Sequence, residues 1–281
     1  MLRLCITSDD FGADIAVNAA VEAAHRDGVL TAASLMVTGA AADDAVARAR
    51  ALPGLGVGLH LVLVDGTPAL APERLPDLVG DDGRFRTDMV ATSFGMLRPR
   101  VRAQLAAEIT AQFEAFAGTG LTLDHANAHK HFHLHPIIGG LLASIGKRFG
   151  LKAIRAPVEP AAVLRQVEPV RVDLAGRVAG IWARRARRRF VAAGFAVPDS
   201  VFGLTWSGAM TARRVAALVA ALPAGSHEIY AHPATADTYP GSAPGYRYRD
   251  ELAALVDPAV RAAVTARGAR LGSFARFGAA A

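Results

Sequence analysis

Residues 2–28, LRLCITSDDFGADIAVNAAVEAAHRDG, form one complete strand–turn–helix pattern. The apolar run Leu2–Thr7 has the length of a buried strand, and two adjacent acids, Asp9 and Asp10, follow at its end. The helical pattern Asp14–Asp27 comes next and stops before a glycine, as helices commonly do. Because a strand followed by a helix is the repeating unit of a parallel sheet, this stretch predicts an α/β fold.

The same pattern recurs along the chain. Further apolar runs of strand length are Ser34–Thr38, Gly56–Leu61, Leu121–His125, Ala153–Arg155, Val201–Leu204, His227–Tyr230 and Arg270–Phe274. Helical patterns between them include Ala41–Ala51, Pro99–Ala117 and Pro136–Phe149. We find neither an internal repeat nor a dividing linker, so we expect a single domain over residues 1–281. Excursions from the barrel are expected near residues 65–98, 173–190 and 233–250, the first with little regular structure.

The composition excludes several classes of protein. A chain of 281 residues that is 52% hydrophobic and 20% charged is not disordered. A single cysteine, Cys5, excludes an intramolecular disulfide and a thiolate zinc cage, and we expect it to be buried in the first strand. No run of 18 apolar residues and no export signal are visible, so we expect a cytoplasmic protein. The net charge of +6, with 28 arginines among 31 basic residues, suggests an anionic partner: nucleic acid, a lipid surface or an acidic small molecule.

Polar residues recur at the ends of the expected strands. The adjacent carboxylates of Asp9 and Asp10 would repel each other unless they share a cation or a proton, although Asp also suits turns and helix caps. His60 closes the run Gly56–Leu61, either as a ligand or as a hydrogen-bonded structural residue. Arg155 ends the short run at residues 153–155. These positions are therefore candidates for one functional site.

A histidine-rich segment, LDHANAHKHFHLHP at residues 123–136, holds five of the nine histidines. In an extended chain the four histidines within His129–His135 would share one face, and not all of them could be metal ligands. A later histidine, His232, precedes a proline that favours extended backbone. We therefore expect His232 to project from a strand end.

The distribution of these residues distinguishes two architectures. In an open sheet neighbouring strands lie ~4.8 Å apart, so strand ends distant in the sheet could not meet one small substrate. In a closed parallel barrel all the carboxyl ends surround one pocket. We therefore predict a (β/α) barrel that is TIM-like in plan without being regular.

The residue types themselves suggest metal-assisted hydrolysis. One Asp and two His are a common ligand set for a divalent metal ion that keeps open coordination positions. Such an ion lowers the pKa of bound water and polarises a carbonyl group. A second acid and a histidine across the pocket would supply general base and general acid for cleavage of an amide or ester. The same ligand set also occurs in non-haem iron oxygenases. A metal-binding scaffold with a nucleic-acid or membrane patch is a further alternative.

Four motifs taken together resemble a known family. SDDFG, GLH, AHKHFHLHP and YAHP occur in the order found in the YdjC-like carbohydrate deacetylases. The resemblance implies a metal-dependent enzyme that removes N-acetyl groups from amino sugars on a barrel of the glycoside hydrolase/deacetylase type. It further implies Asp10, His60 and His129 as ligands of one divalent ion, zinc first, with magnesium, cobalt or manganese as alternatives. Asp9 would be the general base, and His232 the general acid or a substrate-orienting residue.

Substrate contacts are expected from other residues around the pocket. The candidates are His131, His133, Arg155 and Tyr246. Tyr246 belongs to a tyrosine-rich loop at residues 239–248, whose rings would either stack on a sugar or simply pin the loop.

The histidine-rich segment also suggests a branch of the family. Asn127 stands where an acid is common, two residues before the ligand histidine, and a neutral amide cannot raise that ligand's basicity as a carboxylate does. With this Asn, the segment resembles the hopanoid biosynthesis-associated branch, which implies an N-acetylglucosaminyl hopanoid as the glycolipid substrate. A chito-oligosaccharide or another N-acetylated amino sugar is the alternative.

The arginine-rich segment 177–189 is the remaining feature. It suits peripheral contact with the inner face of the cytoplasmic membrane, with Trp182 nearby, or else it is a solvated helix face. We expect no nucleic-acid partner, and the sequence leaves the oligomeric state open.

Overall fold

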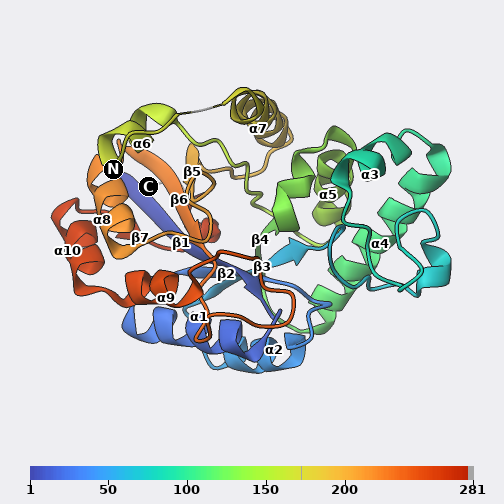
Figure 1. Cartoon of the computed structure of the whole chain (residues 1–281), viewed down its shortest axis with the longest axis horizontal. Coiled ribbons are helices and arrows are strands. Elements are labelled where there is room, and N and C mark those ends of the chain that lie inside the picture. The colour runs from blue at the N-terminus through green and yellow to red at the C-terminus, as the bar shows by residue number, and fades with distance from the viewer. Residues whose placement is uncertain (172, 278–281) are drawn as a thin grey trace.

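The computed structural model describes residues 1–171 and 173–277, with strands at the centre and helices around them (Figure 1). Its strands are β1 (Leu2–Phe11), β2 (Ala32–Leu35), β3 (Gly56–Leu61), β4 (Leu123–Ala128), β5 (Ser200–Phe202), β6 (Gly225–Ala231) and β7 (Arg270–Leu271). Its α-helices are α1 (Ile15–Asp27), α2 (Ala42–Arg50), α3 (Met89–Gly95), α4 (Pro99–Gly118), α5 (Pro136–Arg148), α6 (Ala161–Val167), α7 (Leu174–Ala192), α8 (Ala212–Ala221), α9 (Tyr248–Val256) and α10 (Pro258–Ala266). Short 3₁₀ helices are η1 (Pro72–Arg74), η2 (His129–Leu134) and η3 (Phe274–Arg276).

The strands form one parallel sheet in the order β4-β3-β2-β1-β6-β5, with β7 added beside β1. Single bridges span the interval between β4 and β5: Ile154 pairs with Ala126, and Ala153 pairs with Ala196. The predicted α/β barrel is thus confirmed. The expected strand at residues 153–155 exists only as bridged extended chain, because Pro157 follows at once and lacks the N–H that a ladder needs.

The segment 65–98 has two short helical elements. It contains η1 and α3, and the carboxylate of Asp88 caps α3 by accepting from two backbone N–H groups. The buried Glu108 of α4 accepts from the backbone N–H groups of Ala69 and Leu70 in this segment, and the buried Gln112 bonds both backbone groups of Val62 just before it. The rest of the segment has no regular secondary structure, and its contacts with α4 hold it in place.

The core surrounds the central strand β1. Leu4, Cys5 and Ile6 are fully buried, which confirms the expected burial of Cys5. At the amino end of β4, the carboxylate of Asp124 accepts from Ser273 and from two backbone N–H groups of the C-terminal turn. These contacts fasten the last described turn beneath the barrel, away from the carboxyl ends of the strands. None of the helices in the described residues combines the length and apolar character that a membrane crossing requires.

Candidate metal centre and active site

The two adjacent acids lie at the carboxyl end of β1, just before a tight turn. Asp10 has a left-handed backbone with φ of 61°, and Gly12 follows with φ of 95°. A side chain at Gly12 would place its Cβ 2.9 Å from the carbonyl oxygen of Met36, so this turn requires glycine. The N–H of Gly12 donates to Oδ1 of Asn18 at 2.8 Å, which ties the turn to α1. The strand therefore ends abruptly with both carboxylates at the mouth of the barrel.

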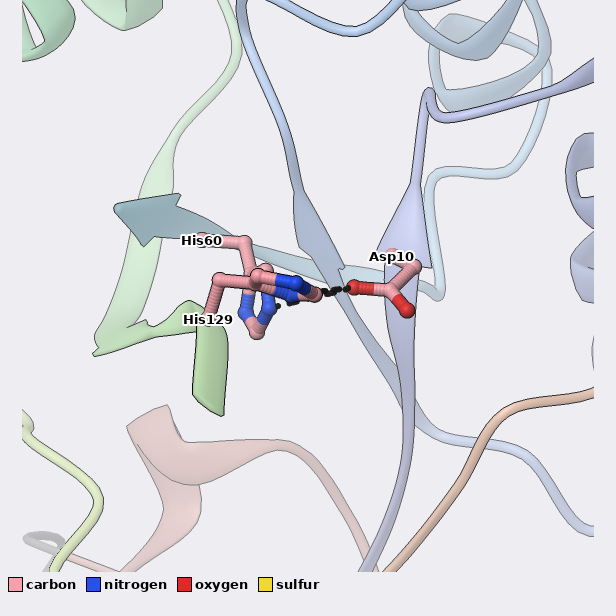
Figure 2. Close-up of side chains that lie close together, drawn as sticks. All are labelled: Asp10, His60 and His129. Atoms are coloured by element: carbon pink, nitrogen blue, oxygen red, sulfur yellow. Dashed lines mark hydrogen bonds and ion pairs between the residues drawn. The ribbon is translucent and has the colours of Figure 1, made fainter. Parts of the chain in front are cut away.

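Asp10 meets two histidines from neighbouring strands. Its Oδ1 lies 3.3 Å from Nε2 of His60, at the end of β3, and 3.2 Å from Nδ1 of His129, directly after β4. Figure 2 shows the carboxylate and the two imidazole rings facing one another. One ligand atom from each of the three residues lies within 4.8 Å of the others. The structure thus brings together the three residues predicted as metal ligands.

The geometry and the donor set fit a divalent cation. Ligand bonds of about 2.1 Å at angles of roughly 90–109° hold neighbouring ligand atoms about 3.0–3.4 Å apart. Both separations measured from Oδ1 of Asp10 fall in that range. One carboxylate oxygen and two imidazole nitrogens suit zinc and other first-row metals. Because all three residues also line an open cleft, positions remain on that side for water and substrate.

Asp9 is held by a buried guanidinium. Nη1 and Nη2 of Arg155 bond the two oxygens of Asp9 at 2.5 and 2.9 Å, and Nε and Nη2 bond Oε1 of Glu228. Arg155 is fully buried, and its guanidinium lies 4.7 Å from the ring centroid of Tyr230. Burial opposes ionisation of Asp9, but the charge of Arg155 overcomes this and holds the pKa of Asp9 below its usual range. Asp9 is therefore a carboxylate at neutral pH.

Asn127 connects the metal centre with this ion-pair network. Its amide lies 2.6 Å from Nδ1 of His60 and 2.9 Å from Oγ of Ser34. The same amide lies 3.0 Å from Nη1 and 3.2 Å from Nη2 of Arg155. An amide can bond both an imidazole and a guanidinium because it carries both a donor and an acceptor.

The histidine-rich segment is a turn and not an extended chain. In η2, Lys130 and His131 have positive φ values of 51° and 53°, so the expectation that its histidines share one face was wrong. Long-range contacts favour the turn: Nζ of Lys130 lies 2.6 Å from Oδ2 of Asp65, and Nε2 of His131 lies 3.0 Å from the hydroxyl of Tyr230. Each histidine consequently has different surroundings.

Two of the remaining histidines have local structural contacts. His133 is fully buried and donates from Nε2 to the carbonyl oxygen of Arg155 at 2.9 Å. Burial lowers the pKa of His133 to about 3, so its ring is neutral. His135 caps α5, where its Nδ1 accepts from the N–H of Ile137. Burial, followed by the charge of Arg155, also holds the pKa of His131 well below its usual range.

The cleft is also lined by His232, which follows β6, and by Tyr246. The buried carboxylate of Glu251 accepts from the backbone N–H of His232 at 2.5 Å and from that of Met210 at 2.8 Å. The rings of His232 and Tyr246 are 5.2 Å apart, and the hydroxyl of Tyr246 lies 2.7 Å from Oγ of Ser207. Nδ1 of His232 is buried and has no hydrogen-bond partner among the described residues. It lies 4.0 Å from Oε2 of the buried Glu251 carboxylate, whereas the His232 residue as a whole lines the cleft.

The cleft has a volume of about 410 Å³. Of the predicted site residues it is lined by Asp9, Asp10, His60, His129, His131, His232 and Tyr246. Arg155 and His133 are not among its lining residues and lie behind them. Glu228 and Tyr230 were not singled out from the sequence, although they alternate with His232 along β6 and its extension. That spacing of two puts side chains on one face of a strand and was the available signal.

The fold and the cleft define a barrel protein with a candidate metal centre at the carboxyl ends of its strands. A family model described as YdjC-like protein matches residues 3–266, and the chain belongs to this YdjC-like family.

Relatives align over different shares of the chain. A carbohydrate deacetylase from Geobacillus stearothermophilus is 31% identical over 281 residues, which cover 99% of each protein. A chitooligosaccharide deacetylase from Enterobacter sp. (strain 638) is 33% identical over 275 residues, covering 96% of this chain and 97% of that one. A carbohydrate deacetylase from Brevibacillus brevis is 36% identical, but the match covers 53% of this chain and only 57% of that protein.

Among solved structures, one described as a candidate cellobiose-phosphate cleavage protein from Enterococcus faecalis V583 superimposes with a TM-score of 0.73. The sequence identity is 23%, and the superposition covers 97% of each chain. This likeness shows the fold alone.

Proposed function

We propose that this protein is a metal-dependent hydrolase that removes the N-acetyl group from an amino sugar. The observation that carries the proposal is the convergence of Asp10, His60 and His129 with Asp9 and His232 in one open cleft. The three-residue centre fits a divalent ion, zinc first and magnesium, cobalt or manganese as alternatives. The similarity to a carbohydrate deacetylase and a chitooligosaccharide deacetylase over nearly the whole chain supports the same chemistry.

When bound at this centre, a divalent ion would acidify water and polarise the acetyl carbonyl oxygen. Asp9 takes the proton of the attacking water. Its carboxylate is ionised before the reaction because Arg155 holds its pKa low, and Arg155 also fixes the direction of its oxygens. Asp9 is thus the general base, and Arg155 acts through it as a positioning residue.

His232 directly follows β6, the strand that pairs with β1, and protonates the departing amine of the sugar. His232 lines the same cleft as both acids, and its Nδ1 lies 4.0 Å from Oε2 of Glu251. Tyr246 offers a ring on which a sugar can stack, and His131 lines the floor beside Tyr230. His133 acts only indirectly, because its hydrogen bond holds the backbone of Arg155.

The substrate within this class is an amino sugar attached to a lipid, an N-acetylglucosaminyl hopanoid, with a chito-oligosaccharide as the alternative. The resemblance of residues 123–136, with Asn127 before the ligand histidine, to the hopanoid-associated branch supports this choice.

A side-by-side assay tests the proposal. Metal-loaded protein is incubated with N-acetylglucosaminyl hopanoid and with chito-oligosaccharide, and acetate release is followed. We expect faster release from the hopanoid glycolipid. Release from the oligosaccharide alone would contradict the lipid assignment and keep the reaction, whereas release from neither would contradict the reaction.

A further inference from the structure

Helix α7 carries an apolar stripe that the described residues leave exposed. Leu174, Val178, Ile181 and Trp182 have exposed fractions of 76, 46, 43 and 41%. Their spacing of four, three and one residues puts them on one side of a helix. The other side, with Ala183, Ala186 and Phe190, is buried against the body of the molecule. Figure 1 shows α7 at the periphery of the molecule. Such a stripe normally requires a partner.

The charge of α7 indicates the chemistry of that partner. The helix holds Arg177, Arg184, Arg185, Arg187, Arg188 and Arg189, and no acidic residue. Within residues 1–171 and 173–277 only Arg187 of this set makes an ion pair, with Asp199 at 2.7 Å. Solvated helix faces usually mix both signs, so that neighbouring charges support one another. On a helix whose charged residues are all cationic, the repulsion between them is relieved instead by an anionic surface.

An apolar groove runs alongside α7. It separates this helix from α5 and has a volume of about 500 Å³. Its apolar lining is Leu134, Pro136, Ala143, Trp182, Ala186 and Phe190. Lys147, Arg185 and Arg189 also line it, and none of its lining residues is acidic. A largely apolar groove whose charged lining residues are all cationic matches an acyl chain with an anionic headgroup.

Two glycines of α5 line the groove, and Gly139 allows α5 to pack closely against η2 and α7. A Cβ at Gly139 would lie 2.6 Å from the carbonyl oxygen of His133 and 3.3 Å from Cζ of Phe190. A Cβ at Gly140 would point toward Nη2 of Arg189 at 3.9 Å. The space beside α7 is therefore part of how α5 and α7 pack.

We propose that α7 and the α5–α7 groove dock the protein on an anionic phospholipid bilayer. The stripe of α7 enters the headgroup region, the exposed arginines contact lipid phosphates, and the groove accepts one acyl chain. Trp182 belongs to both the stripe and the groove, and its ring lies 5.6 Å from the guanidinium carbon of Arg185. This inference deepens the proposed function, since a lipid-linked amino sugar is found at such a surface.

Vesicle sedimentation with the full chain tests the docking without any use of activity. We expect binding to vesicles of phosphatidylglycerol and phosphatidylcholine, weakening as salt is raised, and at least tenfold weaker binding to phosphatidylcholine alone. Equal binding to both, or binding to neither, would overturn the proposal. Equal affinity for an anionic oligonucleotide would overturn it too, in favour of a general polyanion site.

Charge-matched variants locate the surface. R184E/R188E changes two exposed arginines of α7, and R74E/R86E makes the same change of charge at two exposed arginines outside it. We expect the first pair to lose at least tenfold in vesicle affinity and the second to keep most of it. For the apolar stripe, W182A should weaken binding, whereas F94A, which removes an exposed ring from α3, should not. Equal losses of vesicle affinity for the two arginine pairs, or for W182A and F94A, would contradict the assignment of the docking surface to α7.

Tryptophan emission provides a direct readout, because the chain has only Trp182 and Trp206. With W206F, anionic vesicles should shift the emission of Trp182 to the blue; with W182F, the remaining buried Trp206 should not respond. A shift from Trp206 alone would contradict docking through α7. If the wild-type protein does not bind vesicles but releases acetate from a soluble oligosaccharide, only this inference is contradicted. If it binds vesicles but releases no acetate from any substrate, only the proposed function is contradicted.

Discussion

Arg155 donates from Nη1 to Oδ2 of Asp9 at 2.5 Å and from Nη2 to Oδ1 at 2.9 Å, although the two residues are 146 positions apart in the chain. The same guanidinium bonds Glu228, and all three side chains are buried. A bidentate pair of this kind fixes the plane of the carboxylate as well as its charge. The proposed base is therefore oriented by Arg155, from the bridged segment after β4, and this arginine is in turn held by Glu228 of β6, the strand beside β1.

Asp9→Asn tests the base. The amide has the same size but cannot accept a proton, so we expect the rate of acetate release to fall by about 10²–10⁴-fold. Metal content should stay at the wild-type level, because Asp10, His60 and His129 are unchanged. Near-normal deacetylation by a variant that still binds metal would show that Asp9 is not the base.

Arg155→Met tests the buried network. It leaves the carboxylates of Asp9 and Glu228 without their shared cation, and breaking a buried ion pair costs about 3–5 kcal/mol. We expect urea unfolding to show a loss of that order. Adding Glu228→Gln removes one uncompensated charge, so the double variant should be more stable than R155M. If R155M unfolds like the wild type, the network does not contribute to stability as described.

The ionisation of Asp124 makes the free energy of unfolding depend on pH in the acid range. Burial opposes its ionisation, but His125, Ser273 and the backbone of Ala275 outweigh this and lower the pKa of Asp124 below its ordinary 3.8. A carboxyl with a lower pKa in the folded state stabilises above its unfolded pKa and loses that contribution as pH falls through the folded value. Asp124→Asn should therefore cost most at neutral pH, and its deficit in the free energy of unfolding should shrink below about pH 3.8. A deficit that is constant from pH 7 to pH 3 would contradict this.

Tyr246 provides a test of substrate contact. Tyr246→Ala removes the ring beside His232, and a stacking contact of about 0.5–1.5 kcal/mol corresponds to roughly two- to tenfold in KM. Tyr246→Phe keeps the ring and loses only the hydrogen bond with Ser207, so its KM should stay close to the wild-type value. Equal rises in KM for both variants would assign the effect to the hydroxyl group instead.

Much of this site could be predicted because its residues directly follow apolar strands. Asp10, His60 and His129 each stand where a buried run ends, and parallel strands bring such ends together. Their convergence within 4.8 Å is a consequence of the barrel, which strand–helix alternation had already indicated.

The residues behind the cleft were harder to predict, since their positions depend on partners far away in the chain. Arg155 also follows an extended run, but Asp9 and Glu228 draw its side chain inward. Alternation of histidines across residues 129–135 looked like a strand, whereas Asp65 and Tyr230 hold Lys130 and His131 in a left-handed turn. A local pattern does not contain such contacts.

The most direct test of the central claim is a metal titration of acetate release from an N-acetylated amino sugar. Chelator-treated protein should be inactive, and activity should return in proportion to one divalent ion bound per chain. His129→Ala should bind the ion weakly and remain inactive at the same metal concentration. Full acetate release by the chelator-treated protein, or by H129A without bound metal, would contradict a metal centre at Asp10, His60 and His129.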